Sequence, residues 1–181
     1  DLVRSRGLGD VYKRQDYLRA LIGALPPLRL ATGIAPLDVA HRGGLPFPRF
    51  VILAGAPGAG KTTLATAVAY GAARAGHPVA FFAQDEGGDG IADRLGQLTG
   101  IPRHQIEERD EVGLERACER LQALRVQVFD ADEGATLEDA LAWLATTGAG
   151  LPGVLVVDSL QTVRLASAEG FEPRAKVDAV V

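Results

Sequence analysis

Short apolar runs alternate along the chain with longer segments in which apolar residues recur every three or four positions. Apolar runs are typical of strands buried on both faces of a sheet, and they cover residues 50–54, 78–83, 126–129 (interrupted by Gln127) and 154–157. The intervening segments predict helices over residues 62–75, 90–99, 113–124 and 137–147, with Thr136 as the N-cap of the last one. This alternation predicts an α/β fold, in which helices cover both faces of a parallel sheet.

The N-terminal part of the chain does not share this alternation. Residues 1–15, DLVRSRGLGDVYKRQ, have no amphipathic period and resemble translated sequencing-adapter read-through, so we expect a non-native artefact there. Residues 16–49 predict a short helix over 16–24, followed by a proline break and a lead-in rich in glycine and proline. The alternating strands and helices occupy residues 50–181.

Composition narrows the class of protein. The 181 residues are 47% apolar and 23% charged, which is ordinary for a globular protein and argues against wholesale disorder. The chain contains no run of about 18 apolar residues, so the sequence predicts no membrane-spanning helix. Charged residues interrupt the stretch where a signal peptide would lie. The single cysteine, Cys118, excludes an internal disulfide, so we expect a reducing, cytoplasmic location. A net charge of −4 gives no basic field that would attract nucleic acid.

The first predicted strand leads into the motif G-x-x-x-x-G-K-[ST], and a predicted helix follows. The motif residues are Gly55, Ala56, Pro57, Gly58, Ala59, Gly60, Lys61, Thr62 and Thr63. The glycines allow the backbone to curl so that successive N–H groups point at phosphate oxygens, and the helix N-terminus adds a positive dipole. We therefore expect a nucleotide-binding P-loop (Walker A), in which Lys61 bridges the β- and γ-phosphates and Thr62 ligates Mg²⁺.

Carboxylates follow two of the other predicted strands. Asp158 ends the fourth strand, where it can hold Mg²⁺ through water beside Thr62. Asp85 and Glu86 follow the second strand, from which a carboxylate can polarise the attacking water. Gln161, three residues beyond Asp158, is a candidate sensor of the γ-phosphate. A solvated acidic loop and an exposed glutamine are the alternative readings of these last residues.

Together these residues resemble the RecA-like ATPase family over residues 32–181. TGIAPLD and GGLPFP, which precede the P-loop, are similar to the T-G-x-x-x-L-D … G-G-L-P-x-G approach of DnaB-type replicative helicases, RadA-type repair ATPases and KaiC-like proteins. The final glycine of that approach is replaced near Pro48-Arg49. VVDSLQTV resembles the D-S-I-Q-T of RadA-like proteins and the D-Y-L-Q of helicases, and AQDEGGDGIADRLG resembles the segment in which an acidic residue precedes an Arg-Leu pair.

The resemblance implies a RecA-like P-loop NTPase that binds and hydrolyses ATP with Mg²⁺, acts on DNA in replication or repair, and assembles as a homo-hexamer or another ring or filament. It implies Glu86 as the catalytic carboxylate, because glutamate is usual in the family, although the helicase spacing to Arg94 favours Asp85. It also implies a further strand, DNA-facing loops and an arginine finger beyond Val181. We therefore expect a C-terminally truncated core that binds nucleotide weakly and hydrolyses it poorly.

Other functions stay open at this point. A non-motor ATP switch of the KaiC-like kind would use the same site for assembly or signalling. A small-molecule P-loop kinase is less favoured, because no acceptor site is visible and because about fifty residues precede the P-loop. A GTPase is disfavoured, because neither N-K-x-D nor T-K-x-D occurs in the chain.

Overall fold

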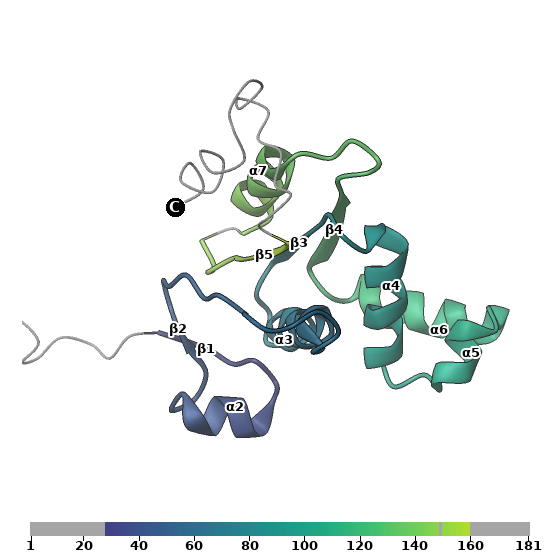
Figure 1. Cartoon of the computed structure of the whole chain (residues 1–181), viewed down its shortest axis with the longest axis horizontal. Coiled ribbons are helices and arrows are strands. Elements are labelled where there is room, and N and C mark those ends of the chain that lie inside the picture. The colour runs from purple at the N-terminus through teal and green to yellow at the C-terminus, as the bar shows by residue number, and fades with distance from the viewer. Residues whose placement is uncertain (1–27, 149, 160–181) are drawn as a thin grey trace, which may run out of the picture.

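The computed structural model describes residues 28–148 and 150–159, and a parallel three-stranded sheet lies at its centre (Figure 1). The middle strand is β3 (Val79–Ala83), and it pairs with β4 (Val126–Asp130) on one side and β5 (Val154–Asp158) on the other. Val79 lies opposite both Val126 and Val154, so the three strands start level with one another. The predicted α/β fold with a parallel sheet is confirmed.

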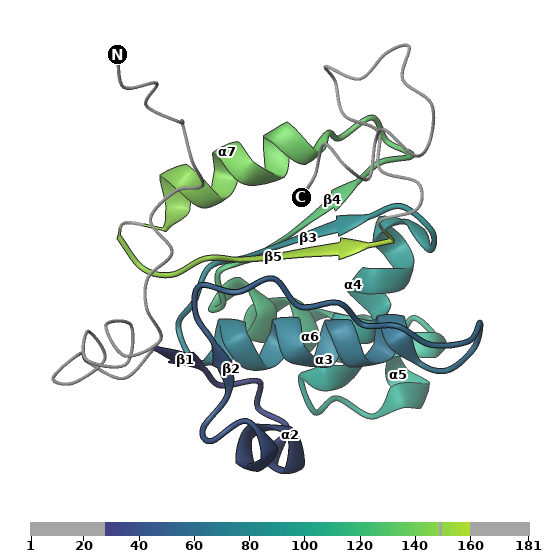
Figure 2. The same cartoon turned by 60° about the vertical axis from the view of Figure 1, so that its left-hand side comes forward.

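Helices cover both faces of this sheet (Figure 2). α3 (Lys61–Arg74) and α4 (Gly87–Leu98) pack on one face, and α7 (Leu137–Thr147) packs on the other. The first face is an apolar cluster that includes Ala69, Ala72, Val79, Phe81, Ala83, Ile91 and Leu95. On the second face Phe82 packs against Leu137. Every residue of β3 is buried, so its side chains alternate between two apolar layers and none of them faces water.

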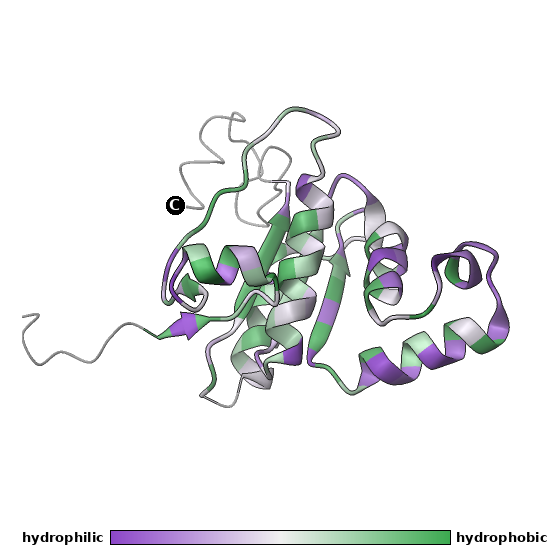
Figure 3. Ribbon diagram, turned by 90° about the horizontal axis from the view of Figure 1, so that it is seen from below, coloured by the Kyte–Doolittle hydropathy of each residue, from purple (hydrophilic) through white to green (hydrophobic). Residues whose placement is uncertain are grey.

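The four helices predicted beyond residue 60 and the last three predicted strands begin within three residues of their observed starts. α4 begins earlier than predicted, because Gly87 and Gly88 are poor helix formers and masked its first turn. α5 (Arg103–Glu107) was not predicted, since five residues are too few to show a period. α6 (Glu111–Gln122) follows it, with alternating hydrophilic and hydrophobic stripes in Figure 3. Among the described helices, none is both long and apolar enough to cross a membrane.

The start of α7 is fixed by a reciprocal cap between Asp139 and Thr136, the residue that the sequence predicted as the N-cap. The Thr136 hydroxyl accepts a hydrogen bond from the Asp139 N–H at 3.2 Å, and Asp139 Oδ2 accepts from the Thr136 N–H at 2.9 Å. Oδ2 also accepts from the Thr136 hydroxyl at 2.6 Å, and this bond is the main cause that lowers the pKa of Asp139. The cap satisfies donors that the first turn of a helix leaves without a partner.

The strand predicted over residues 50–54 is wrong. These residues form an irregular segment, and the side chains of Phe50 and Ile52 are 62% and 66% exposed. An apolar run becomes a buried strand only where a neighbouring strand accepts its backbone hydrogen bonds and two layers cover its faces. Within residues 28–148 and 150–159 no strand pairs with this segment.

The lead-in folds into a small unit beside α3. β1 (Arg29–Leu30) pairs with β2 (Leu45–Pro46) in antiparallel fashion, and α2 (Ala35–Ala40) lies between them in the chain. The Thr32 N–H and hydroxyl both donate to Asp38 Oδ1, at 2.8 and 2.7 Å. These bonds lower the pKa of Asp38, the backbone bond being the larger cause. The predicted helix over residues 16–24 and the expected artefact over 1–15 lie outside the described residues.

The lead-in contacts α3 at a glycine. A Cβ added at Gly71 would lie 1.8 Å from the carbonyl oxygen of Thr32, far inside van der Waals contact. Thr32 itself is fully buried, so its backbone has little room to move away. The two backbones therefore approach as closely as they do only because position 71 carries no side chain.

We expect Gly71→Ala to lower the free energy of unfolding by about 1–3 kcal/mol, the usual cost of overpacking, even though alanine is the better helix former. Gly96→Ala is the matched control, because a Cβ at this helical glycine would meet its nearest atom at an ordinary 3.6 Å. Urea unfolding of the two variants measures the difference. Equal stability of the two variants would contradict the close contact.

Candidate functional site

The loop of residues 55–60 joins the irregular segment to α3. It turns through two glycines in the left-handed region, Gly58 with φ 75° and Gly60 with φ 82°. Side chains rarely adopt these angles, so the shape of the loop depends on glycine at both positions. Every residue of the loop is exposed, and its backbone is accessible to a ligand from solvent.

The N-terminus of α3 carries no cap from a side chain. Gly60 is the N-cap residue and makes no side-chain hydrogen bond, and the first turn holds no acidic residue. The first N–H groups of the helix therefore keep their donor capacity, at the positive end of a 14-residue helix dipole. Such an end favours an anion.

Lys61, the first residue of α3, turns its side chain over the preceding loop. Its Nζ donates hydrogen bonds to the carbonyl oxygens of Gly55 and Ala56, both at 3.1 Å. The ammonium group and the uncapped end of α3 thus lie at the same loop. Together they offer positive charge and N–H donors to one ligand, which suits a phosphate group.

The carboxyl ends of the strands lie at the same end of the molecule as the N-terminus of α3 (Figure 2). The strand register sets Asp130 and Asp158 on either side of Ala83, the last residue of β3. The Gln84 N–H donates to the Asp158 carbonyl at 2.8 Å, which keeps the chain beside β5 just before Glu86. In open parallel sheets ligands bind at this end of the strands.

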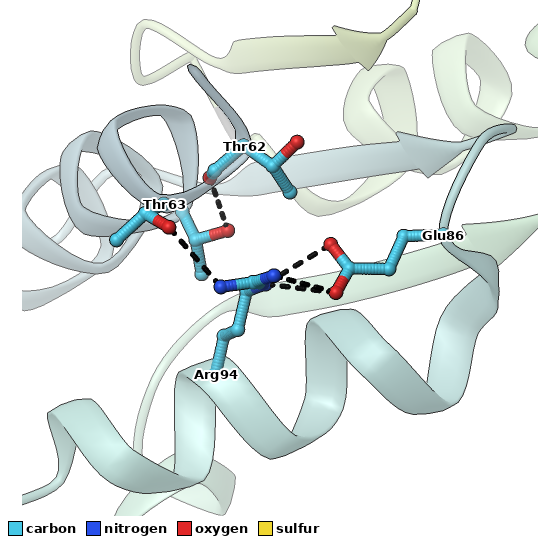
Figure 4. A network of polar contacts seen from close by, with 5 residues as sticks. Thr62, Thr63, Glu86 and Arg94 are labelled. Atoms are coloured by element: carbon cyan, nitrogen blue, oxygen red, sulfur yellow. Dashed lines mark hydrogen bonds and ion pairs between the residues drawn. The ribbon is translucent and has the colours of Figure 1, made fainter. Parts of the chain in front are cut away.

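Glu86 is joined to α3 through Arg94 of α4 (Figure 4). Arg94 Nη2 donates to Glu86 Oε1 at 2.6 Å, and Nε donates to Oε1 and Oε2 at 3.1 and 3.0 Å. The remaining arm of the guanidinium, Nη1, donates to Thr63 Oγ1 at 3.1 Å. Thr63 lies in the first turn of α3, beside Lys61 and Thr62, so the network links the carboxylate to the helix that carries the lysine.

Asp130 holds the N-terminus of α4 against the end of β4. Its Oδ2 accepts a hydrogen bond from the Gly88 N–H, and its Oδ1 accepts one from the Asp132 N–H at 2.8 Å. A Cβ at Gly88 would lie 2.9 Å from Oδ2, so a side chain there would push the Asp130 carboxylate away. The bond from Gly88 is the largest cause that lowers the pKa of Asp130.

The oxygens of Thr62 and Asp158 suit Mg²⁺, but they do not make a metal cage. In the described part of the chain, no three His, Cys, Asp or Glu side chains gather closely enough to hold a metal ion. Mg²⁺ prefers hard oxygen donors, keeps several waters and takes further oxygens from substrate phosphates. The donor set therefore fits a magnesium ion that arrives together with a nucleotide.

The structure brings most of the predicted site residues to one end of the sheet. Lys61 and Thr62 open α3, and Glu86 reaches α3 through Arg94. Asp158 lies at the neighbouring strand end, and its charge adds to the hydrogen bond with Glu86 in raising the pKa of Arg94. Asp85 is exposed, and Gln161 lies outside the described residues.

Two residues of the site were missed by the sequence analysis. Arg94 served there only as a spacing marker, although its charge is what contacts Glu86. Asp130 directly follows a mostly apolar strand, a signal similar to the one that singled out Asp158, so the same rule could have found it. Its contact with Gly88, 42 positions away in the chain, has no local signature.

One family profile matches most of the chain. The profile of a family described as AAA domain matches residues 19–175. No curated protein sequence matches the chain.

Two solved structures share its fold. One, described as an ATPase domain, superimposes with a TM-score of 0.67 and 20% identity, over 92% of this chain and 61% of that one. The other, a DnaB-like replicative helicase described with its interactions with primase, gives a TM-score of 0.65 and 20% identity, over 93% of this chain and 44% of that one. The chain thus spans less than two thirds of either protein. These likenesses confirm the RecA-like P-loop fold.

The lowered pKa of Asp130 predicts how stability changes in acid. A carboxyl group whose pKa is lower in the folded state than in the unfolded state stabilises the fold when the pH lies above its unfolded-state pKa. This contribution is lost as the pH falls through the folded-state pKa. We expect Asp130→Asn to be less stable than the wild type at pH 7, and the gap to close as pH falls below the ordinary value of 3.8. Urea unfolding from pH 7 to pH 3 measures the gap.

Asp132→Asn removes an equal charge from the same turn and serves as the control for net charge. A gap between the wild type and Asp130→Asn that stays constant down to pH 3 would show that Asp130 does not act through its charge.

Proposed function

The chain belongs to the AAA domain family, and we propose that it binds ATP together with Mg²⁺ at the loop before α3 and hydrolyses it. The observation that carries this proposal is the position of Lys61. Its ammonium lies over a loop shaped by left-handed glycines, at the uncapped end of α3 and at the same end of the molecule as the strand termini. Positive charge, N–H donors and carboxylates therefore meet where a triphosphate would bind.

Each residue has a proposed role in this reaction. Lys61 and the N–H groups of α3 bind the phosphates, and Thr62 and Asp158 would hold Mg²⁺, which neutralises charge on the phosphate oxygens when bound. Glu86 acts as the general base that orients the attacking water. Its carboxylate is directed toward α3, which supports it over the neighbouring Asp85. Gln161 is proposed as a sensor of the γ-phosphate.

We further propose that the full-length protein is a DNA-dependent motor, a helicase or a repair ATPase, that assembles as a hexamer or another ring or filament. The support is the likeness of its fold to the solved ATPase domain and to the DnaB-like replicative helicase. The net charge of −4 adds no support for DNA binding. A KaiC-like ATP switch is the alternative, because it would use the same fold and the same loop.

We expect Lys61→Ala to weaken ATP binding at least tenfold, or about 1.4 kcal/mol, since it removes the cation from the loop. Titration of a fluorescent ATP analogue in the presence of Mg²⁺ measures the affinity. Arg74→Ala is the matched control, because it removes the same charge from the opposite end of the same helix. Equal binding by Lys61→Ala and the wild type would rule out the proposed phosphate site.

DNA dependence has its own test on the full-length protein. A motor should hydrolyse ATP about tenfold faster or more when single-stranded DNA is added, and the stimulation should fall as salt screens phosphate contacts. Steady-state phosphate release with and without DNA measures this. Turnover that DNA leaves unchanged at low salt would favour the switch.

A further inference from the structure

Arg94 bridges two elements that carry different parts of the proposed reaction. Its guanidinium contacts Glu86, in the loop after β3, and Thr63, in the first turn of α3 (Figure 4). A guanidinium presents its donors in one rigid plane, so fixing one arm fixes the others. Arg94 thereby fixes the position of the Glu86 carboxylate relative to the helix that begins with Lys61.

The path of the Glu86 side chain depends on a glycine. Glu86 is the N-cap residue of α4, and Arg94 lies eight positions further along, about 12 Å of helix rise away. The two side chains cover this span together, and that of Glu86 passes over position 90, one turn from each partner. A Cβ at Gly90 would lie 2.7 Å from Glu86 Cγ and 3.1 Å from Cδ. Alanine at position 90 would therefore push the carboxylate away from Arg94.

Stability alone does not account for this arrangement. The side chains of Glu86 and Arg94 are each 35% exposed, and ion pairs at such exposure contribute little to folding. The glycine at position 90 even weakens α4, because glycine is a poorer helix former than alanine. The Glu86–Arg94 ion pair thus adds little to stability, and its geometry needs a glycine that weakens the helix. This combination indicates that the ion pair serves the reaction.

The hydrogen bonds leave Glu86 able to act as a base. A carboxylate offers about four acceptor positions, two on each oxygen. The guanidinium donates twice to Oε1 and once to Oε2, so an acceptor position stays available on Oε2 for a water molecule. Arg94 also keeps its charge in this setting, because the hydrogen bond to Glu86 raises its pKa above the ordinary value.

We propose that Arg94 is a positioning residue for ATP hydrolysis, which holds the Glu86 carboxylate at a fixed place relative to the phosphate-binding end of α3 through Thr63. The inference rests on the proposed function, since it needs Glu86 to be the general base. It predicts that disturbing the bridge slows turnover without weakening ATP binding. Displacement of a general base by about 1 Å can cost up to a hundredfold in rate.

The decisive variant is Gly90→Ala in the full-length protein, because it leaves Glu86, Arg94 and Thr63 in place chemically. We expect kcat to fall roughly ten- to a hundredfold, with KM for ATP and the affinity for a fluorescent ATP analogue within about twofold of wild type. The thermal midpoint should stay level or rise, since alanine favours the helix. A merely structural role would move stability and activity in the same direction.

Three further variants sharpen the test. Arg94→Gln should lower kcat as much as Gly90→Ala, and Thr63→Val should lower it less, because it removes only one of the four hydrogen bonds. Arg109→Gln, which breaks the Arg109–Asp93 ion pair on the outer side of α4, should keep wild-type kcat. In a Glu86→Gln background Gly90→Ala should have no further effect, because both changes act through the same carboxylate.

Each outcome decides between two ideas. If the wild type hydrolyses ATP and Gly90→Ala turns over at the wild-type rate or faster, Arg94 does not position the base, and the proposed function stands. Additive losses in the Glu86→Gln background would equally overturn the inference. If the wild type neither binds nor hydrolyses ATP, or if Lys61→Ala retains full turnover, the proposed function fails and the role of Arg94 fails with it.

Discussion

The register of the parallel sheet is the constraint on which the rest of the structure depends. β3 is buried along its whole length and pairs with a strand on each side, so its hydrogen bonds fix where both neighbours end. Asp130 and Asp158 both lie opposite Ala83 as a result. A slip of β3 by one residue would turn Phe81 and Phe82 to the opposite faces and move both strand-end carboxylates out of register with Ala83. The register of β3 therefore determines both the packing of the core and the geometry of the site.

Part of this arrangement can be predicted from the sequence, because buried strands and helices show characteristic patterns of apolar residues. The run PVAFFA has no polar position, and a strand between two apolar layers needs none, so β3 was predicted correctly. Thr136 predicted the start of α7 correctly because a helix cap is a local interaction. The loop before Lys61 was predicted for the same reason, since the loop and the helix start are adjacent in the chain.

The rest could not be predicted, because it depends on contacts between distant positions. The apolar run over 50–54 has the composition of a buried strand, but composition carries no information on whether a pairing strand is at hand. The contact of Asp130 with Gly88 joins positions 42 residues apart, and Gly71 meets the Thr32 carbonyl only once the lead-in has folded. Arg94 lies eight residues from Glu86, a spacing that no helical neighbour rule would select.

The irregular segment before the loop has a further consequence for the site. In the described residues the loop is not anchored by a strand on its N-terminal side, so its position follows from α3 alone. α3 is held by the buried faces of Ala69, Ala72 and Ala73 against the sheet, and by the lead-in at Gly71. Small side chains let a helix lie close to a sheet, and close packing leaves it little freedom to rotate. Lys61 and Thr63 are thereby fixed relative to β3, after which Glu86 follows in the chain. Arg94 connects α3 with Glu86, and both α3 and α4 pack on the same apolar cluster.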